Sequence, residues 1–92
     1  MTPLETTLSE RQKTHGDFAL HAMVTQKIKQ AMIYAAYRND AYYFSPICAE
    51  ALDMIAHKIG RIINGDPDYA DSWIDIAGYA KLVVDRLQGV VR

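Results

Sequence analysis

The sequence predicts an all-α fold with three main helices and a short polar segment ahead of them. Three long stretches carry apolar residues at intervals of three and four, the spacing of one face of a helix. No run shows the strict alternation of apolar and polar residues that a half-buried strand requires. The 92 residues suffice for one domain and are too few for two cores. We therefore expect a single domain over 1–92, with residues 1–16 as a polar lead-in.

The first main helix is expected over about residues 18–37. Ahead of it, residues 3–12 can form a short helix, because Pro3 suits a first helical position. Gly16 breaks the chain, and Asp17 suits the N-cap of the next helix, since its carboxylate can accept from free N–H groups of the first turn. The apolar stripe of this helix consists of Leu20, Val24, Ile28, Ala31, Met32 and Ala35.

The second main helix follows an aromatic connector at 41–44, in which Tyr42, Tyr43 and Phe44 could stack on a base. Ser45 followed by Pro46 is a helix start, and Asn64–Gly65 is a helix stop, which together predict a helix over 46–63. Its apolar residues fall on one side of the helix: Leu52, Ile55, Ala56, Ile59, Ile62 and Ile63.

The third main helix should reach about Leu87 after a turn at 66–68, with Asp68 or Asp71 as its cap. Gly78 lies inside it. Glycine costs about 1 kcal/mol relative to alanine in an exposed helix, so we expect another helix or a ligand to approach Gly78 closely. The predicted buried face consists of Trp73, Ile76, Ala77, Ala80, Val83, Val84 and Leu87.

Composition limits the classes of function. Half of the residues are hydrophobic, more than a small three-helix core can hide, so we expect an antiparallel bundle completed by oligomerisation. The net charge of −1 does not indicate the basic surface that binding to nucleic acid requires. Cys48 is the only cysteine, which excludes an internal disulfide. No apolar run is long enough for a membrane span, and we expect a soluble, cytoplasmic protein.

Acidic residues on the two last helices are the candidate metal ligands. On the 46–63 helix, Glu50 and Asp53 share a polar ridge with His57 and Arg61, opposite the isoleucine stripe. Two carboxylates at i,i+3 can point oxygens into a common volume, as a hard cation requires. The alternative is a solvated helix face with contacts worth a few tenths of a kcal/mol each.

The short turn at 64–68 forces these two helices to lie antiparallel. Asp53 and Asp75 then lie at similar heights, so a cluster with Glu50 and Asp71 is possible. Four unpaired acids so close would repel one another without a cation. Either Mg²⁺ or Mn²⁺ binds there, or the acidic faces diverge. Asp71 also has a second interpretation, because it stands where an N-cap or first-turn acid stabilises the helix dipole.

The amino-terminal run 11–17 is a second candidate site. It holds Arg11, Lys13, His15 and Gly16 ahead of a helix N-terminus, where free N–H groups and the helix dipole favour an anion. A charged surface turn is the more common interpretation of such a run. His21, near the apolar stripe of its helix, is expected to be a core or interface histidine.

Three segments carry a resemblance: 53–62 (DMIAHKIGRI), 71–80 (DSWIDIAGYA), and 11–17 with the pattern Arg-x-Lys-x-His-Gly-Asp. Through them nearly the whole chain resembles a family of small, largely uncharacterised phage and prophage proteins. That family is similar to the all-α, MazG-like nucleoside triphosphate pyrophosphohydrolases, in which Glu-x-x-Glu on one helix and Glu-x-x-Asp on the next hold Mg²⁺.

The resemblance implies a Mg²⁺ site made of Glu50, Asp53, Asp75 and Asp71, with Lys13, Lys58 or Arg61 on the phosphates. Asp53 replaces the second glutamate, and Ser72 stands three before Asp75, so Asp71 has to serve instead. The implied function is Mg²⁺-dependent nucleotide binding by a homo-oligomer, with hydrolysis of a triphosphate to monophosphate and pyrophosphate. The alternatives are sequestration of a nucleotide without cleavage, and a small helical interaction module.

Overall fold

The computed structural model describes residues 1–38 and 45–92, which form four α-helices and no strand. These are α1 (Pro3–His15), α2 (Phe18–Arg38), α3 (Pro46–Asn64) and α4 (Ala70–Leu87). The predicted all-α class is confirmed. The polar lead-in is a full helix of 13 residues, so the chain has a fourth helix in place of a short segment. The predicted base-stacking residues Tyr42, Tyr43 and Phe44 lie outside the described residues.

Three of the helices begin at side-chain caps. The hydroxyl of Thr2 accepts from the N–H of Glu5 at 3.1 Å, and the carboxylate of Asp17 accepts from the N–H of Ala19 at 2.7 Å. The hydroxyl of Ser45 accepts from the N–H of Cys48 at 3.2 Å. These bonds satisfy N–H groups that have no partner within a helix.

The start of α4 differs from its prediction. Its N-cap is Tyr69, which makes no side-chain cap, so the expected capping by Asp68 or Asp71 is wrong. Asp71 lies in the first turn of the helix and accepts a hydrogen bond from the Tyr69 hydroxyl at 3.0 Å. Its carboxylate still lies near the positive end of the helix dipole.

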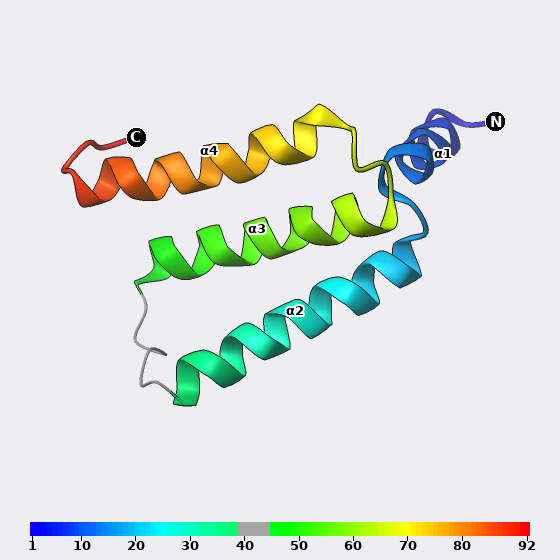
Figure 1. The fold of residues 1–92 in the computed structure, drawn as a ribbon. Coiled ribbons are helices and arrows are strands. Elements are labelled where there is room, and N and C mark those ends of the chain that lie inside the picture. Colours follow the sequence, from blue (N-terminus) through cyan, green and yellow to red (C-terminus); the bar gives the residue numbers. More distant parts are fainter. Residues whose placement is uncertain (39–44) are drawn as a thin grey trace.

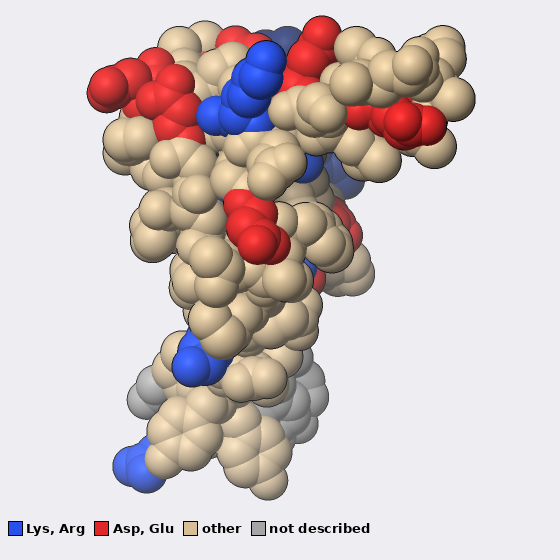
Figure 2. All heavy atoms as spheres, turned by 90° about the vertical axis from the view of Figure 1, so that its right-hand side faces the viewer, with Lys and Arg blue, Asp and Glu red and all other residues tan. Residues whose placement is uncertain are grey.

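The helices α2, α3 and α4 form a single layer with α3 in the middle (Figure 1). Within the described residues, α2 and α4 each pack on α3 and do not contact one another. Helix α1 lies across one end, and the molecule seen from that end narrows to a column below it (Figure 2). The radius of gyration is 15.4 Å, whereas a compact chain of this length has about 12 Å.

Glycine permits the close contact between α2 and α3. A Cβ atom at Gly60 would overlap the hydroxyl of Thr25 and lie 3.0 Å from Nδ1 of His21. The contact between α3 and α4 includes an ion pair between Lys58 and Asp75 at 3.0 Å. Gly78, by contrast, has no atom of residues 1–38 or 45–92 within 4 Å of the position of a Cβ, so no helix of this part of the chain approaches it closely.

Two turns meet where α1 joins the layer. Gly16 has φ +77°, and a Cβ there would overlap the carbonyl of Asn64. A Cβ at Gly65 would in turn overlap the carbonyl of Thr14. That carbonyl accepts from the N–H of Asp66 at 2.7 Å. These contacts fix α1 against the carboxyl end of α3.

A layer of helices buries few apolar side chains. Among the described residues, only Ala51 and Ala56 are buried and apolar. On the predicted buried face of α4, Trp73 is 54%, Val84 44% and Leu87 78% exposed. These three residues of the predicted buried face are therefore exposed in the single chain. No helix in the described part of the chain is both long and apolar enough to cross a membrane.

Candidate functional site

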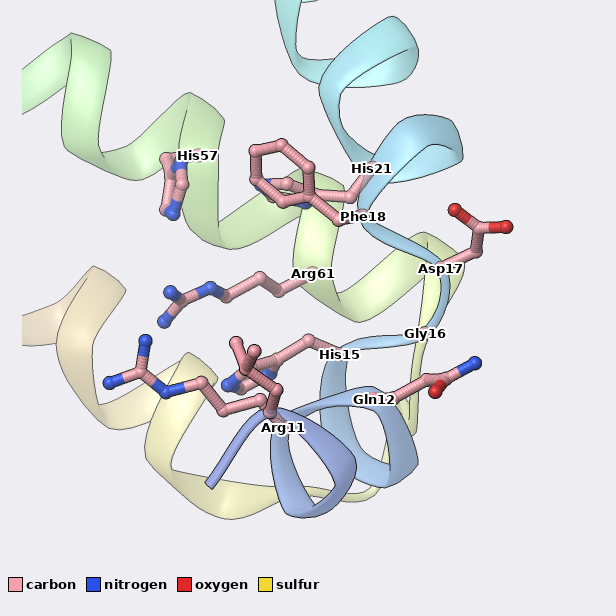
Figure 3. Close-up of a pocket in the computed structure, with 10 residues that line it drawn as sticks. Arg11, Gln12, His15, Gly16, Asp17, Phe18, His21, His57 and Arg61 are labelled. Atoms are coloured by element: carbon pink, nitrogen blue, oxygen red, sulfur yellow. The ribbon is translucent and has the colours of Figure 1, made fainter. Parts of the chain in front are cut away.

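A cavity of about 390 Å³ lies between α1, the start of α2 and the second half of α3 (Figure 3). Most of its polar lining side chains are basic or imidazole groups. The lining residues are Leu8, Arg11, Gln12, His15, Gly16, Asp17, Phe18, His21, His57 and Arg61.

Two helices supply matched pairs of these side chains. Arg11 and His15 lie four residues apart on α1, and His57 and Arg61 lie four residues apart on α3. Residues at i and i+4 share one face of a helix, so each helix presents an arginine and a histidine to the cavity. The close contact between the turns at Gly16 and Gly65 holds α1 beside α3, so that the two pairs face the same cavity.

The cavity carries positive charge, and no carboxylate of residues 1–38 or 45–92 forms an ion pair with it. Neither Arg11 nor Arg61 has an ion-pair partner among the described residues. Asp17 is the only acid among the described residues that line the cavity. Its carboxylate caps α2 and points away from the two guanidinium groups (Figure 3). An anion in the cavity would therefore meet two unpaired arginines.

Aromatic groups form the wall on the α2 side. The rings of His21 and His57 meet edge to face, with centroids 4.6 Å apart. The Phe18 ring lies 6.1 Å from the His21 ring and is 77% exposed. The predicted core or interface role of His21 holds in part, because the residue is 5% exposed and also lines the cavity.

All three histidines have pKa values below the ordinary value. Burial, and next the Arg61 charge, lowers the pKa of His57 to about 4. Burial also lowers the pKa of His15, again with Arg61 as the next cause. For His21, burial outweighs an opposing effect of the Gly60 backbone. The histidines are thus neutral at pH 7, and the arginines provide the charge.

The predicted metal ligands lie elsewhere. Glu50 and Asp53 are exposed on α3, Asp71 accepts from the Tyr69 hydroxyl, and Asp75 pairs with Lys58. Within residues 1–38 and 45–92, no three His, Cys, Asp or Glu side chains lie close enough together to hold a metal ion. The four-carboxylate Mg²⁺ or Mn²⁺ site stays a prediction.

Of the three predicted phosphate-binding cations, only Arg61 lines the cavity. Lys58 is 8% exposed and paired with Asp75, and Lys13 is exposed on α1 outside the cavity lining. Arg11, two residues before Lys13, lines the cavity. The sequence feature that could have identified Arg11 is its i,i+4 spacing to His15, which is the same as the spacing of His57 and Arg61.

The chain matches no protein-family model, no curated protein and no solved structure. The resemblance to MazG-like pyrophosphohydrolases stays a prediction from the sequence.

Proposed function

We propose that this chain binds the phosphate groups of a nucleotide in the basic cavity. The observation that carries the proposal is the pair Arg11 and Arg61, which face one cavity and have no ion-pair partner in the part of the chain that the structure describes. A guanidinium group presents N–H donors in a planar fork that matches two oxygens of a phosphate. Both arginines remain charged at any physiological pH.

The cavity also suits the remainder of a nucleotide. Phe18 and Leu8 place apolar surface at its rim, where they are 77% and 55% exposed. An aromatic ring can stack on a base, because both present flat π-faces. Neutral histidines add hydrogen-bonding groups next to the arginines. Arginine, histidine and an aromatic ring together favour a nucleotide over a bare inorganic anion.

Hydrolysis is a separate question from binding. In this structure Asp75 pairs with Lys58 at 3.0 Å and Asp71 accepts a hydrogen bond from the Tyr69 hydroxyl, so two of the carboxylates expected to hold Mg²⁺ have protein partners. We derive no hydrolytic step from this arrangement. Binding without cleavage, one of the alternatives from the sequence, is the function that the cavity supports best.

A thermal-shift screen tests the proposal. Nucleoside mono-, di- and triphosphates are added with and without Mg²⁺, and every hit is assayed for pyrophosphate release. A ligand at 100 times its Kd should raise the free energy of unfolding by about 2.7 kcal/mol. We expect a shift with wild type that Arg11→Gln and Arg61→Gln each reduce at the same ligand concentration, because each substitution removes one charged contact to the phosphates.

Arg86→Gln is the matched control, because Arg86 is exposed near the end of α4, away from the cavity. It should keep the shift. Equal shifts in Arg61→Gln and in the control would place binding elsewhere, and no shift with any nucleotide would refute the proposal. Pyrophosphate release that depends on Mg²⁺ and on Glu50 and Asp75 would extend it to the hydrolase that the resemblance implies.

A further inference from the structure

The helices leave one complete face of the layer uncovered. A globular domain buries its core between at least two layers of secondary structure. Here α2, α3 and α4 make one layer: α2 and α4 each contact α3, and in the described part of the chain they do not contact one another (Figure 1). Helix α1 lies across one end and does not cover the layer.

The residues of α3 show which face is apolar. Lys58 faces α4, through its ion pair, and Gly60 faces α2, through Thr25. Successive helical residues are rotated by about 100°, so His57 and Ile59 project from opposite faces of the layer. His57 marks the face with the basic cavity. Ile59 marks the other face, together with Leu52 and Ile55.

A groove of about 400 Å³ runs along that second face between α3 and α4. Its lining contains no charged side chain and consists of Cys48, Ala51, Leu52, Ile55, Ala80 and Val83. The predicted stripe of α4 continues the apolar surface, with Trp73 and Leu87 largely exposed. The stripes that the sequence predicts for a core thus form an open surface.

The solvent-accessible surface area of the chain indicates how much surface a partner could cover. One chain of 10.4 kDa exposes 6778 Å², whereas a folded monomer of that mass exposes about 5,400 Å². The excess is about 1,400 Å² per chain. A standard interface covers about 800 Å² on each partner, and obligate homodimers cover more. The surface that this chain exposes beyond that of a compact monomer is therefore as large as one side of an obligate interface.

We infer that a second copy of this chain covers the apolar face, so that the protein is a two-layer homodimer. An isologous contact pairs a surface with itself, and the groove can do so because it carries no charge that would face its own copy. A chain with so small a core needs a partner in order to stay folded, and a second copy is present whenever the chain is made. The two basic cavities then lie on the outer faces of the dimer.

Sedimentation equilibrium and thermal unfolding over a wide range of protein concentration test this inference. We expect a mass twice the 10.4 kDa of the chain and a Tm that rises with concentration, because folding and association are linked. Leu52→Glu places a charge in the groove and should abolish the dimer. Either a folded monomer or an unfolded chain from this variant supports the inference.

Ile74→Glu is the matched control, because Ile74 is 62% exposed on α4 outside the groove lining. It should leave the dimer intact. A wild-type monomer with a Tm independent of concentration would overturn the inference and indicate another occupant, such as a lipid surface or a different protein. A dimer that survives Leu52→Glu, or that Ile74→Glu alone disrupts, would overturn the assignment of the face.

Discussion

Lys58 on α3 and Asp75 on α4 form an ion pair at 3.0 Å across the layer, and the Lys58 side chain is only 10% exposed. The resemblance implies a phosphate-binding role for Lys58 and a metal-binding role for Asp75. In the structure, Lys58 and Asp75 instead pair with one another. An ammonium group in such a place needs a counter-charge, because removing it from water is costly.

Replacing Asp75 by Asn should therefore destabilise the fold even without ligand. Loss of one partner from a fully buried pair costs about 3–5 kcal/mol, but Asp75 is 44% exposed and water can reach the site. We expect a loss of about 1–2 kcal/mol in the free energy of unfolding, measured by chemical denaturation without Mg²⁺. Glu50→Gln, which alters an exposed carboxylate, should change little. A variant with wild-type stability that has lost only a response to Mg²⁺ would favour the metal role of Asp75.

Replacing Gly60 by Ala tests the close contact between α2 and α3. The added methyl group would overlap the Thr25 hydroxyl, and forced overpacking of this kind costs about 1–3 kcal/mol. Gly78→Ala is the matched control, because nothing lies within 4 Å of a Cβ there. It should stabilise the helix by about 0.5–1 kcal/mol. Urea unfolding of both variants measures the contrast, and similar effects of the two substitutions would contradict the described packing.

The pKa of His57 predicts how stability depends on pH. Its pKa is about 4 in the folded chain, against an ordinary value of 6.5. Between these values the unfolded chain binds more protons than the folded one, so stability rises with pH. The contribution of neutral His57 is complete above pH 6.5 and is lost as the pH falls toward 4. Unfolding measured across this range should show a weaker decline in His57→Asn, and equal declines would contradict the assignment.

Anion binding should raise the pKa values of His15 and His57. Both are lowered in part by the charge of Arg61, and a phosphate group beside that arginine offsets its effect. Affinity should therefore increase as the pH falls below 7, with proton uptake on binding. NMR titration of the histidine ring signals, with and without inorganic phosphate, measures the shifts. Unchanged ring titrations at saturating phosphate would exclude binding in this cavity.

More of the helices than of the candidate site can be predicted from the sequence. Ser45–Pro46 and Asp17 predict helix starts because capping acts between neighbours in the chain. Periodicity shows that Ile59 and Val83 lie on apolar sides of their helices, but not whether another chain covers them. The partner of Asp75 and the place of Arg11 depend on contacts between distant segments, including the meeting of Gly16 with Asn64. Local spacing carries no information on such contacts.

Calorimetric titration of the most effective nucleotide into wild type, Arg61→Gln and Arg86→Gln tests the central claim most directly. A hydrogen-bonded charged contact is worth about 1.5–3 kcal/mol, so Arg61→Gln should weaken binding by about 10- to 100-fold. Arg86→Gln should bind like wild type. Wild-type affinity in the folded Arg61→Gln protein would contradict nucleotide binding in the basic cavity.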